Sequence, residues 1–249
     1  MDAMIAERAV AAAVRTGIWG SPIPPVPAAV DAFRVEFRSK RRPSRLVGWR
    51  HFAAITALGI GATALTAAMV RSPAWWEWAS ILPAFLFANF VEWLAHRYPM
   101  HHPLKPLTVA YEMHTLLHHR LFTETSMDAE TTSDFDMVLF SPPSLSFFML
   151  GVAAPVAALF FALVSWNAGW IFVALALDYY VLYEYFHLAY HLPEESWVGR
   201  LPGMARLRRH HTHHHDHRLM ADWNFNVTFP IFDRLFGTHW ERSPRGRRS

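Results

Sequence analysis

An all-α integral membrane protein is predicted, with four transmembrane helices in two hairpins and a cytoplasmic, His-rich helical cap holding a di-metal site. Three features predict it. Of the 249 residues, 53% are hydrophobic and 17% are charged, whereas soluble chains average about 25% charged residues. Residues 137–177 contain no Asp, Glu, Lys, Arg or His, about twice the length that crosses a bilayer. Finally, 15 of the 16 histidines lie between His96 and His239.

The N-terminal part of the chain is interpreted as a cytoplasmic segment at the membrane surface. Residues 2–16 have the pattern of a short amphipathic helix, and the proline-rich residues 21–27 cannot be helical. Basic residues concentrate between Arg34 and Arg50, where they fix the topology or bind anionic headgroups. No secretory signal is recognisable. The expected divisions are an N-terminal segment, a membrane catalytic domain and a basic tail, at 1–49, 50–240 and 241–249.

Four apolar stretches are long enough to span a bilayer. The first lies between Arg50 and Arg71, and the second runs from Trp75 to about Ala95. Its opening tryptophans are typical of a membrane interface. The long uncharged run is divided by the turn-like sequence Trp-Asn-Ala-Gly-Trp, which predicts two further helices. Their expected bounds are 143–164 and 169–191. A soluble helical protein is the alternative, but so long an uncharged run is hard to bury in a fold of this size.

The distribution of basic residues predicts the orientation. The turns at 71–74 and 165–169 together hold one Arg, and the other 22 Lys and Arg residues lie beyond the opposite helix ends. The positive-inside rule places those ends in the cytoplasm. The chain is therefore expected to be a multi-pass protein of a bacterial inner membrane, with its N-terminus, histidines and C-terminus cytoplasmic. Its high isoelectric point does not indicate nucleic-acid binding.

The histidines form four groups, and their spacing suits metal ligands. Residues four apart lie on one face of an α-helix, as in His114/His118, His187/His191 and His211/His215. An adjacent histidine lets one helix reach two metals. His96 and His101 are five apart with Pro99 between them, so their convergence requires a local break in the helix. A solvated, loosely metal-binding tract is the alternative for any single group.

Ten candidate imidazoles are too many for one ion, which takes about four ligands, and suit two. The chain has no Cys, which excludes disulfides, thiolate zinc sites and thiolate-ligated haem. Imidazole itself suits zinc, copper, iron and nickel alike. Several polar side chains could accept the second ring N–H of a ligand and fix its tautomer: Glu92, Glu184, Asp216, Asp222 and Asn224. Asp178, deep in the fourth span, is either a catalytic group or a helix–helix hydrogen-bond partner.

The boxes EWLAHRYPMH, HTLLHH, YEYFHLAYH and RRHHTHHH, with the trailing NFNVTFPIFDRLFGTHW, resemble the fatty acid hydroxylase / sterol desaturase superfamily. The likeness covers about residues 50–240. The second box has three residues between its first two histidines, where the commonest family form has two. The ligands that the resemblance implies are His96, His101, His114, His118, His119, His187, His191, His211, His214 and His215, with His210 in reserve. His102 and His239 are not expected to be ligands.

The resemblance implies a membrane-bound, O2-dependent di-iron oxygenase that hydroxylates an unactivated C–H bond of a lipid. Zinc can replace iron at such imidazole sites in purified samples. The sequence contains no fused cytochrome b5-like domain, so electrons are expected from a separate ferredoxin- or cytochrome b5-type donor with its reductase. Lipid desaturation by the same metals is the nearest alternative. A His-rich membrane metal transporter or sensor is a more remote one, because transport requires ligands near the bilayer midplane.

Overall fold

The computed structural model describes residues 17–21, 23–40 and 45–241, and within them it is all-helical, without a β-strand. Four helical stretches are long and apolar enough to cross a membrane. They are Gly48–Met69, Trp75–Met100, Thr132–Leu163 and Trp166–Tyr190. The all-α prediction with four spans is therefore confirmed. The predicted amphipathic helix at 2–16 and residues 242–249 of the predicted tail lie outside the described residues.

The spans differ in how regular they are. The first is one helix, α3 (Arg45–Met69), and the fourth is another, α9 (Trp166–Tyr190). The second joins η2 (Trp75–Ser80) and α4 (Ile81–Ala95) to the π-helical turn η3 (His96–Met100). The third begins earlier than expected and is divided into four pieces, because prolines interrupt it. These pieces are η5 (Thr132–Met137), α7 (Pro142–Ser146), the π-helical η6 (Phe147–Ala153) and α8 (Ala154–Leu163).

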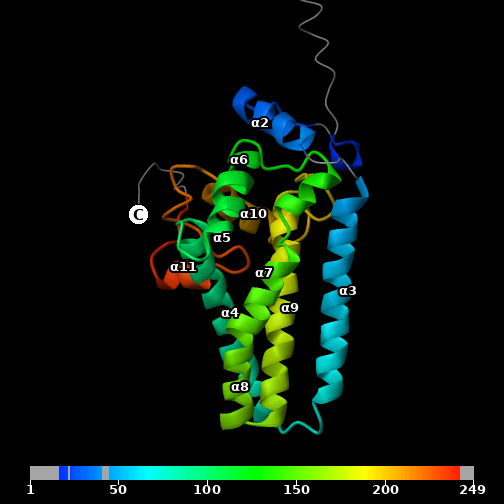
Figure 1. The fold of residues 1–249 in the computed structure, drawn as a ribbon, viewed down its shortest axis with the longest axis vertical. Helices are drawn as coiled ribbons and strands as arrows, with labels where there is room; N and C mark the ends of the chain where they lie inside the picture. Colours follow the sequence, from blue (N-terminus) through cyan, green and yellow to red (C-terminus); the bar gives the residue numbers. More distant parts are fainter. Residues whose placement is uncertain (1–16, 22, 41–44, 242–249) are drawn as a thin grey trace, which may run out of the picture.

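Helix α9 is the centre of the bundle, since α3, α4 and α8 all pack against it (Figure 1). Small residues permit close approach: an added Cβ at Gly59 would lie 2.9 Å from the side chain of Val181. A polar contact joins the same two helices, because Thr63 Oγ1 donates to Asp178 Oδ1 over 2.5 Å. Of the two predicted roles of Asp178, the structure therefore shows the helix–helix hydrogen bond.

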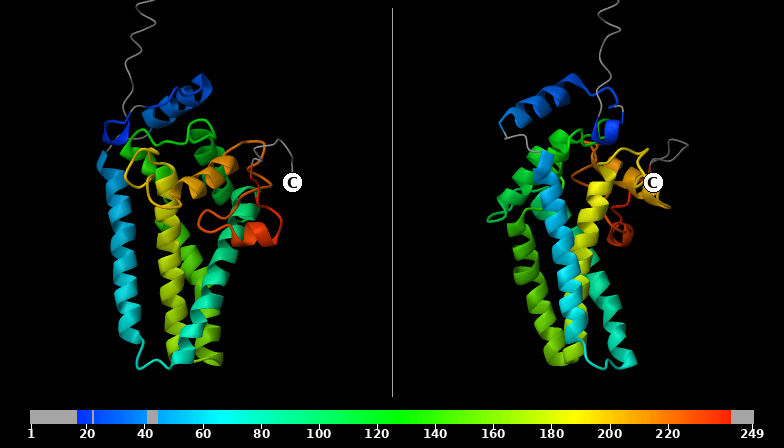
Figure 2. Two further views of the ribbon diagram at one scale, coloured as in Figure 1. Left: turned by 180° about the vertical axis from the view of Figure 1, so that it is seen from behind. Right: turned by 90° about the vertical axis from the view of Figure 1, so that its right-hand side faces the viewer.

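The two ends of the bundle have different structures (Figure 2). At one end lie the α3–η2 connection and the α8–α9 turn, tied together because Asn167 Nδ2 donates to Glu77 Oε2 over 2.9 Å. The tryptophans expected at the interface lie here, and Trp75 is 86% exposed. Short helices cover the other end: α2 (Ala28–Ser39), α5 (Thr108–Tyr111), the π-helical η4 (Glu112–His118), α6 (His119–Leu121), α10 (Met204–His214) and α11 (Ile231–Leu235). We call these helices and the connections between them the cap.

Candidate metal centre

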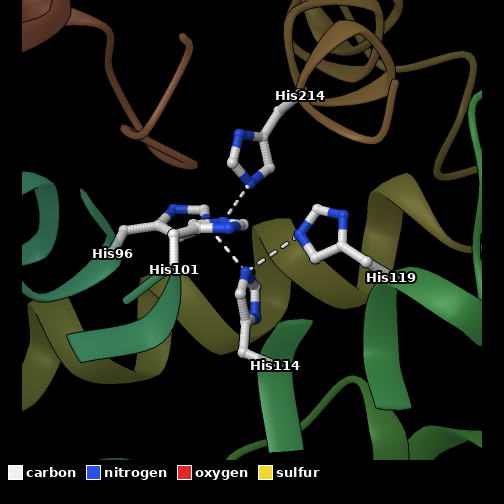
Figure 3. Close-up of side chains that lie close together, drawn as sticks. All are labelled: His96, His101, His114, His119 and His214. Atoms are coloured by element: carbon white, nitrogen blue, oxygen red, sulfur yellow. Dashed lines mark hydrogen bonds between the residues drawn. The ribbon is translucent and has the colours of Figure 1, made fainter. Parts of the chain in front are cut away.

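The ten histidines predicted as ligands meet inside the cap in two groups of five. In each group, one ring nitrogen of every residue lies within 4.8 Å of those of all the others. Group I consists of His96, His101, His114, His119 and His214, shown in Figure 3. Group II consists of His118, His187, His191, His211 and His215. All ten residues are buried, although imidazole is polar.

Two π-helical turns explain how group I forms. His96 and His101 are five residues apart, as are His114 and His119, which in a regular α-helix places them about 140° apart. The turns η3 and η4 lie at these two positions. A π-helix closes its hydrogen bonds between residues five apart, so each pair converges. The local break expected between His96 and His101 is therefore a π-helical turn.

Regular helical spacing brings together most of group II, and pairs of adjacent histidines connect the two groups. His187 on α9 and His191, which follows its last residue, are four apart and both belong to group II, as do His211 and His215. The adjacent pairs His118–His119 and His214–His215 divide between the groups. The second and fourth boxes therefore each serve both groups, whereas the first serves only group I and the third only group II.

Hydrogen bonds fix which nitrogen of each ring carries its proton. A carbonyl oxygen can only accept, so a ring nitrogen that contacts one carries the hydrogen. Five residues of the two groups donate from Nδ1 to backbone carbonyls over 2.5–2.9 Å: His96 to Phe225, His214 to Trp223, His118 to Met137, His191 to Met127 and His215 to Phe122. Their Nε2 atoms are left with a lone pair.

His101 has the same tautomer for a different reason. Thr115 Oγ1 donates to the carbonyl of Met100 over 2.6 Å, which uses its only hydrogen. The hydroxyl therefore accepts from His101 Nδ1, 3.1 Å away. The Nε2 of His101 is then unprotonated and faces the Nε2 of His214 at 3.0 Å.

This arrangement fits a metal ion in each group. In group II, the Nε2 atoms of His118 and His215 face each other at 3.2 Å. Neither pair, His101–His214 or His118–His215, can form a hydrogen bond, because both members carry their proton on Nδ1. Facing lone pairs repel each other unless a cation lies between them. Metal–imidazole bonds of about 2.1 Å place two nitrogens at right angles about 3.0 Å apart, close to both distances.

Burial keeps the rings neutral and able to bind a cation. It lowers the pKa of His118 to about 3 and that of His214 to about 4. Burial also lowers the pKa of His114, His119 and His211 well below the usual range, and neighbouring histidines add to the shift. Each ring can therefore offer a lone pair at neutral pH without first losing a proton.

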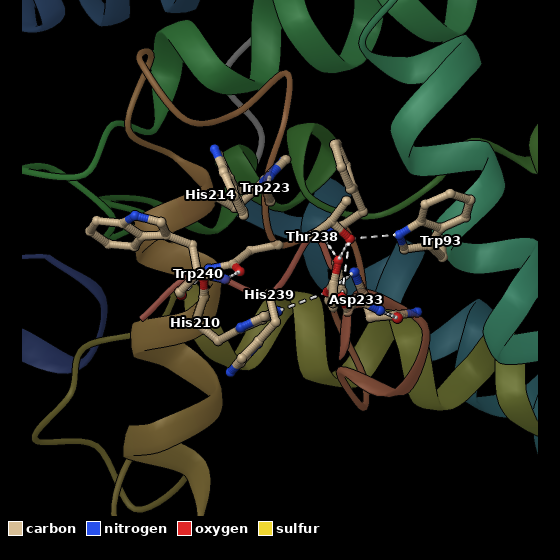
Figure 4. A network of polar contacts seen from close by, with 12 residues as sticks. Trp93, His210, His214, Trp223, Asp233, Thr238, His239 and Trp240 are labelled. Carbon is tan, nitrogen blue, oxygen red and sulfur yellow. Dashed lines mark hydrogen bonds and ion pairs between the residues drawn. The ribbon is translucent and has the colours of Figure 1, made fainter. Parts of the chain in front are cut away.

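A buried carboxylate, that of Asp233, fixes the backbone next to group I (Figure 4). Asp233 accepts from the backbone N–H of Phe225 over 2.9 Å and of Asn226 over 2.8 Å. It also accepts from Thr238 Oγ1 over 2.8 Å and contacts His210 Nε2 at 3.1 Å. Burial raises its pKa, but hydrogen bonds from His210 and its other donors outweigh that effect, so the pKa is lowered overall. The charged Asp233 thus fixes the backbone at Phe225 and Asn226, and the carbonyl of Phe225 accepts from His96.

The carboxylates predicted to accept from ligand rings do something else. Glu92 accepts from the backbone N–H of Thr228 over 2.9 Å, and Glu184 accepts from that of Phe140 over 3.1 Å. Asp216 pairs with Arg218 and Asp222 is exposed. None of the predicted ring contacts is among the hydrogen bonds of the described residues; the Nδ1 atoms of His96, His214 and His215 donate to backbone carbonyls instead.

The remaining predicted residues also lie outside the two groups. Asn224, in a left-handed conformation with φ 61°, donates from Nδ2 to the carbonyls of His210 and Trp240 and contacts no ring nitrogen. His210, the reserve ligand, bonds Asp233 and stacks on His239. His102 is exposed, as expected for a residue that is not a ligand. Asp178 belongs to neither group.

Two largely apolar cavities reach the histidine groups from the membrane-spanning part. The deeper one, of about 80 Å³, lies between α4, η6 and α9 and touches His96. The other, of about 310 Å³, is lined by His114 of group I and by His118 and His187 of group II. Phe140 and Phe148 line both cavities. An apolar chain can therefore approach both groups from the same side.

Sequence reasoning assigned no role to Asp233, to Thr115 or to the backbone carbonyls that accept from the rings. Asp233 lies in the trailing motif, so its position was signalled but its partner was not. Thr115 lies inside the second box, but nothing in the motif marks it as a hydrogen-bond partner of a ring. A backbone carbonyl carries no sequence signal at all, since every residue has one.

Comparisons with known proteins agree with this geometry. The sequence profile described as Fatty acid hydroxylase matches residues 81–238. Among solved structures, the chain is similar to full-length Scs7p, of which only the hydroxylase domain is visible. The TM-score is 0.53 at 22% identity, over 81% of this chain and 69% of that one, a likeness of fold. No curated protein sequence gives a significant match. Because the profile covers more than half of its length, the chain belongs to the fatty acid hydroxylase family.

Proposed function

We propose that the protein is a membrane-bound, O2-dependent di-iron oxygenase that hydroxylates an unactivated C–H bond of a lipid. One observation carries the proposal: ten buried, neutral histidines form two groups of five with their lone pairs converging. Membership of the fatty acid hydroxylase family supports a lipid hydroxylase-type oxidoreductase. Each group would hold one ion, with Nε2 of His101 and His214 among the ligands in group I and Nε2 of His118 and His215 among those in group II. Iron at these positions would supply the redox chemistry that activates O2.

The protein's own residues bind the substrate and exclude water. The cavity lining of Phe87, Phe148 and Met149 suits a hydrocarbon chain. His114, His118 and His187 line the larger cavity, so the carbon to be oxidised would lie beside them. The lipid substrate is expected to enter from the bilayer, because the smaller cavity lies among membrane-spanning helices.

The electron donor is proposed to be a separate protein of the ferredoxin or cytochrome b5 type. It would approach the cap, since the ligand groups lie there and not along the bundle. The same placement argues against a metal transporter, whose ligands would lie near the midplane. We further propose that the cap is cytoplasmic and that the membrane is a bacterial inner membrane.

The test compares cells that express the wild-type chain, His118→Ala and His102→Ala. Only the wild type and His102→Ala should produce a lipid one oxygen heavier, and only in air, because His102 is exposed and belongs to neither group. Lipid mass spectrometry measures the product. Metal analysis should show two ions per wild-type chain and about one in His118→Ala, with equal membrane insertion.

Three outcomes would contradict the proposal. A lipid two hydrogens lighter would identify a desaturase at the same site. If His118→Ala made as much product as the wild type, the histidine groups would not be the site of the reaction. Iron-loaded wild-type protein that makes no product when a donor and mixed lipids are supplied would argue against an oxygenase, and metal uptake by whole cells would then be measured.

A further inference from the structure

Arg34, on α2, lies outside the residues matched by the family profile, yet it is one of the most buried side chains, at 1% exposure. Its guanidinium donates in three directions. Nε reaches the carbonyl of Leu121 over 2.8 Å, and Nη2 reaches that of Ser126 over 2.7 Å. Nη1 pairs with Glu130 over 2.7 Å. One side chain thus ties together both ends of the loop that follows α6.

Each carbonyl that Arg34 holds lies one residue before a carbonyl that orients a group II ring. Leu121 precedes Phe122, whose carbonyl accepts from His215 Nδ1 over 2.7 Å. Ser126 precedes Met127, whose carbonyl accepts from His191 Nδ1 over 2.8 Å. A shift of this loop would therefore turn two of the five group II rings together.

Packing strengthens the same connection. The Phe122 ring lies with its centroid 5.6 Å from Arg34 Cζ and 4.3 Å from the centroid of the His191 ring. The loop also holds the backbone of α9, since the N–H of Ala129 donates to the carbonyl of His191 over 2.8 Å. Arg34 makes no contact with a ligand ring in the interactions described, so its effect is exerted through this loop.

We propose that Arg34 is a positioning residue for group II. Helix α2, which precedes the first span, would then help to orient the metal ligands. The inference rests on the proposed function, because it assumes that group II holds an ion. Its guanidinium presents donors in a planar fork, which a lysine ammonium cannot reproduce. Lysine at this position would keep the charge opposite Glu130 but could not hold Leu121 and Ser126 at once.

Arg38 provides a matched control on the same helix. It pairs with Glu130 and Asp134, each over 2.7 Å, and so helps to dock α2. It donates to neither of the carbonyls that Arg34 holds. Arg34→Lys and Arg38→Lys therefore both preserve charge and both loosen α2, but only the first releases the loop that carries Phe122 and Met127.

The experiment titrates metal-stripped, full-length protein in detergent with Co²⁺ against a competing chelator, and records the visible absorption of the bound ions. The wild type should bind two Co²⁺ per chain. In Arg34→Lys one site should weaken about 10–100-fold, the usual effect of removing a partner that orients a ligand, and its absorption bands should change. In Arg38→Lys both sites should match the wild type.

Each remaining result has a defined meaning. Wild-type affinity and spectrum at both sites of Arg34→Lys would overturn the inference. An equal loss of affinity in Arg38→Lys would also overturn it, because it would show that Arg34 acts only by docking α2. If Arg34→Lys does not fold, Arg34→Gln tests the same contacts, because a glutamine amide cannot donate to the carbonyls of Leu121 and Ser126 and to Glu130 at once; unchanged affinities there would overturn the inference. A wild-type chain that binds no Co²⁺ would instead contradict the proposed function.

Discussion

Six of the ten ligand-like histidines carry their proton on Nδ1, where a backbone carbonyl or the hydroxyl of Thr115 accepts it. The resemblance to the family's boxes implied the ten residues that gather in the two groups, whereas spacing alone left the register of the last histidine tract open. The partners of their Nδ1 atoms could not be predicted, because these are mostly backbone carbonyls from distant segments, such as Phe225 for His96 and Met137 for His118. Acidic neighbours in the sequence, such as Glu184, were therefore assigned ring contacts that the structure does not show.

The residue that should matter most behind group I is Asp233. Asp233→Asn keeps the size of the side chain but leaves only one oxygen to accept, so the backbone of Phe225 and Asn226 is held less firmly. Group I should lose about 10–100-fold in metal affinity, while group II stays unchanged. Titration with Co²⁺ measures both sites.

Asp216→Asn is the control for this prediction, because Asp216 lies in the cap but pairs with the exposed Arg218. Equal metal affinities in Asp233→Asn and the wild type would show that the orientation of His96 does not depend on the carboxylate.

Among the elements, the π-helical turns were beyond sequence reasoning. A period of 3.6 residues places His114 and His118 on one helix face, whereas the structure groups His114 with His119 across η4. A π-helical turn holds one more residue than an α-helical turn. The turn therefore accommodates the extra residue that distinguishes this second box from the commonest family form.

Deleting Leu116, which is 42% exposed within η4, should consequently be tolerated. The deletion places His114 and His119 four residues apart, which brings them to one face of a regular α-helix. We expect two metal ions per chain, measured by metal analysis of the purified protein.

The deletion of Ala189 is the opposite case. Ala189 lies in the regular helix α9 between His187 and His191, and its removal rotates His187 relative to His191 by about 100°, so metal should be lost from group II. Metal loss from the Leu116 deletion as well would mean that η4 has another purpose.

For the whole molecule, the sequence was most informative. Apolar length alone predicted four spans, and the tryptophans and the position of the histidines were consistent with their two ends. Packing was less predictable: the helices were expected as two hairpins, and the structure shows α9 in contact with the other three. Apolar runs with little periodicity do not reveal which helix lies at the centre.

Orientation can be tested directly, because the chain has no cysteine of its own. Ser72→Cys places a thiol between the first two spans, and Ala221→Cys places one in the cap; both positions are exposed. With a membrane-impermeant maleimide on intact bacteria, Ser72→Cys should be labelled and Ala221→Cys should react only after permeabilisation. The reverse pattern would place the cap outside the cell.

The contribution of α10 to both groups bears on how the protein is made. This helix and the residue that caps it supply His214 to group I and His211 and His215 to group II, and it follows the fourth of the spans described. A ribosome therefore completes all four spans before either set of five ligands exists. Metal binding by either complete group would consequently be a late event in biosynthesis, and a chain released before α10 is translated carries four histidines of one group and three of the other.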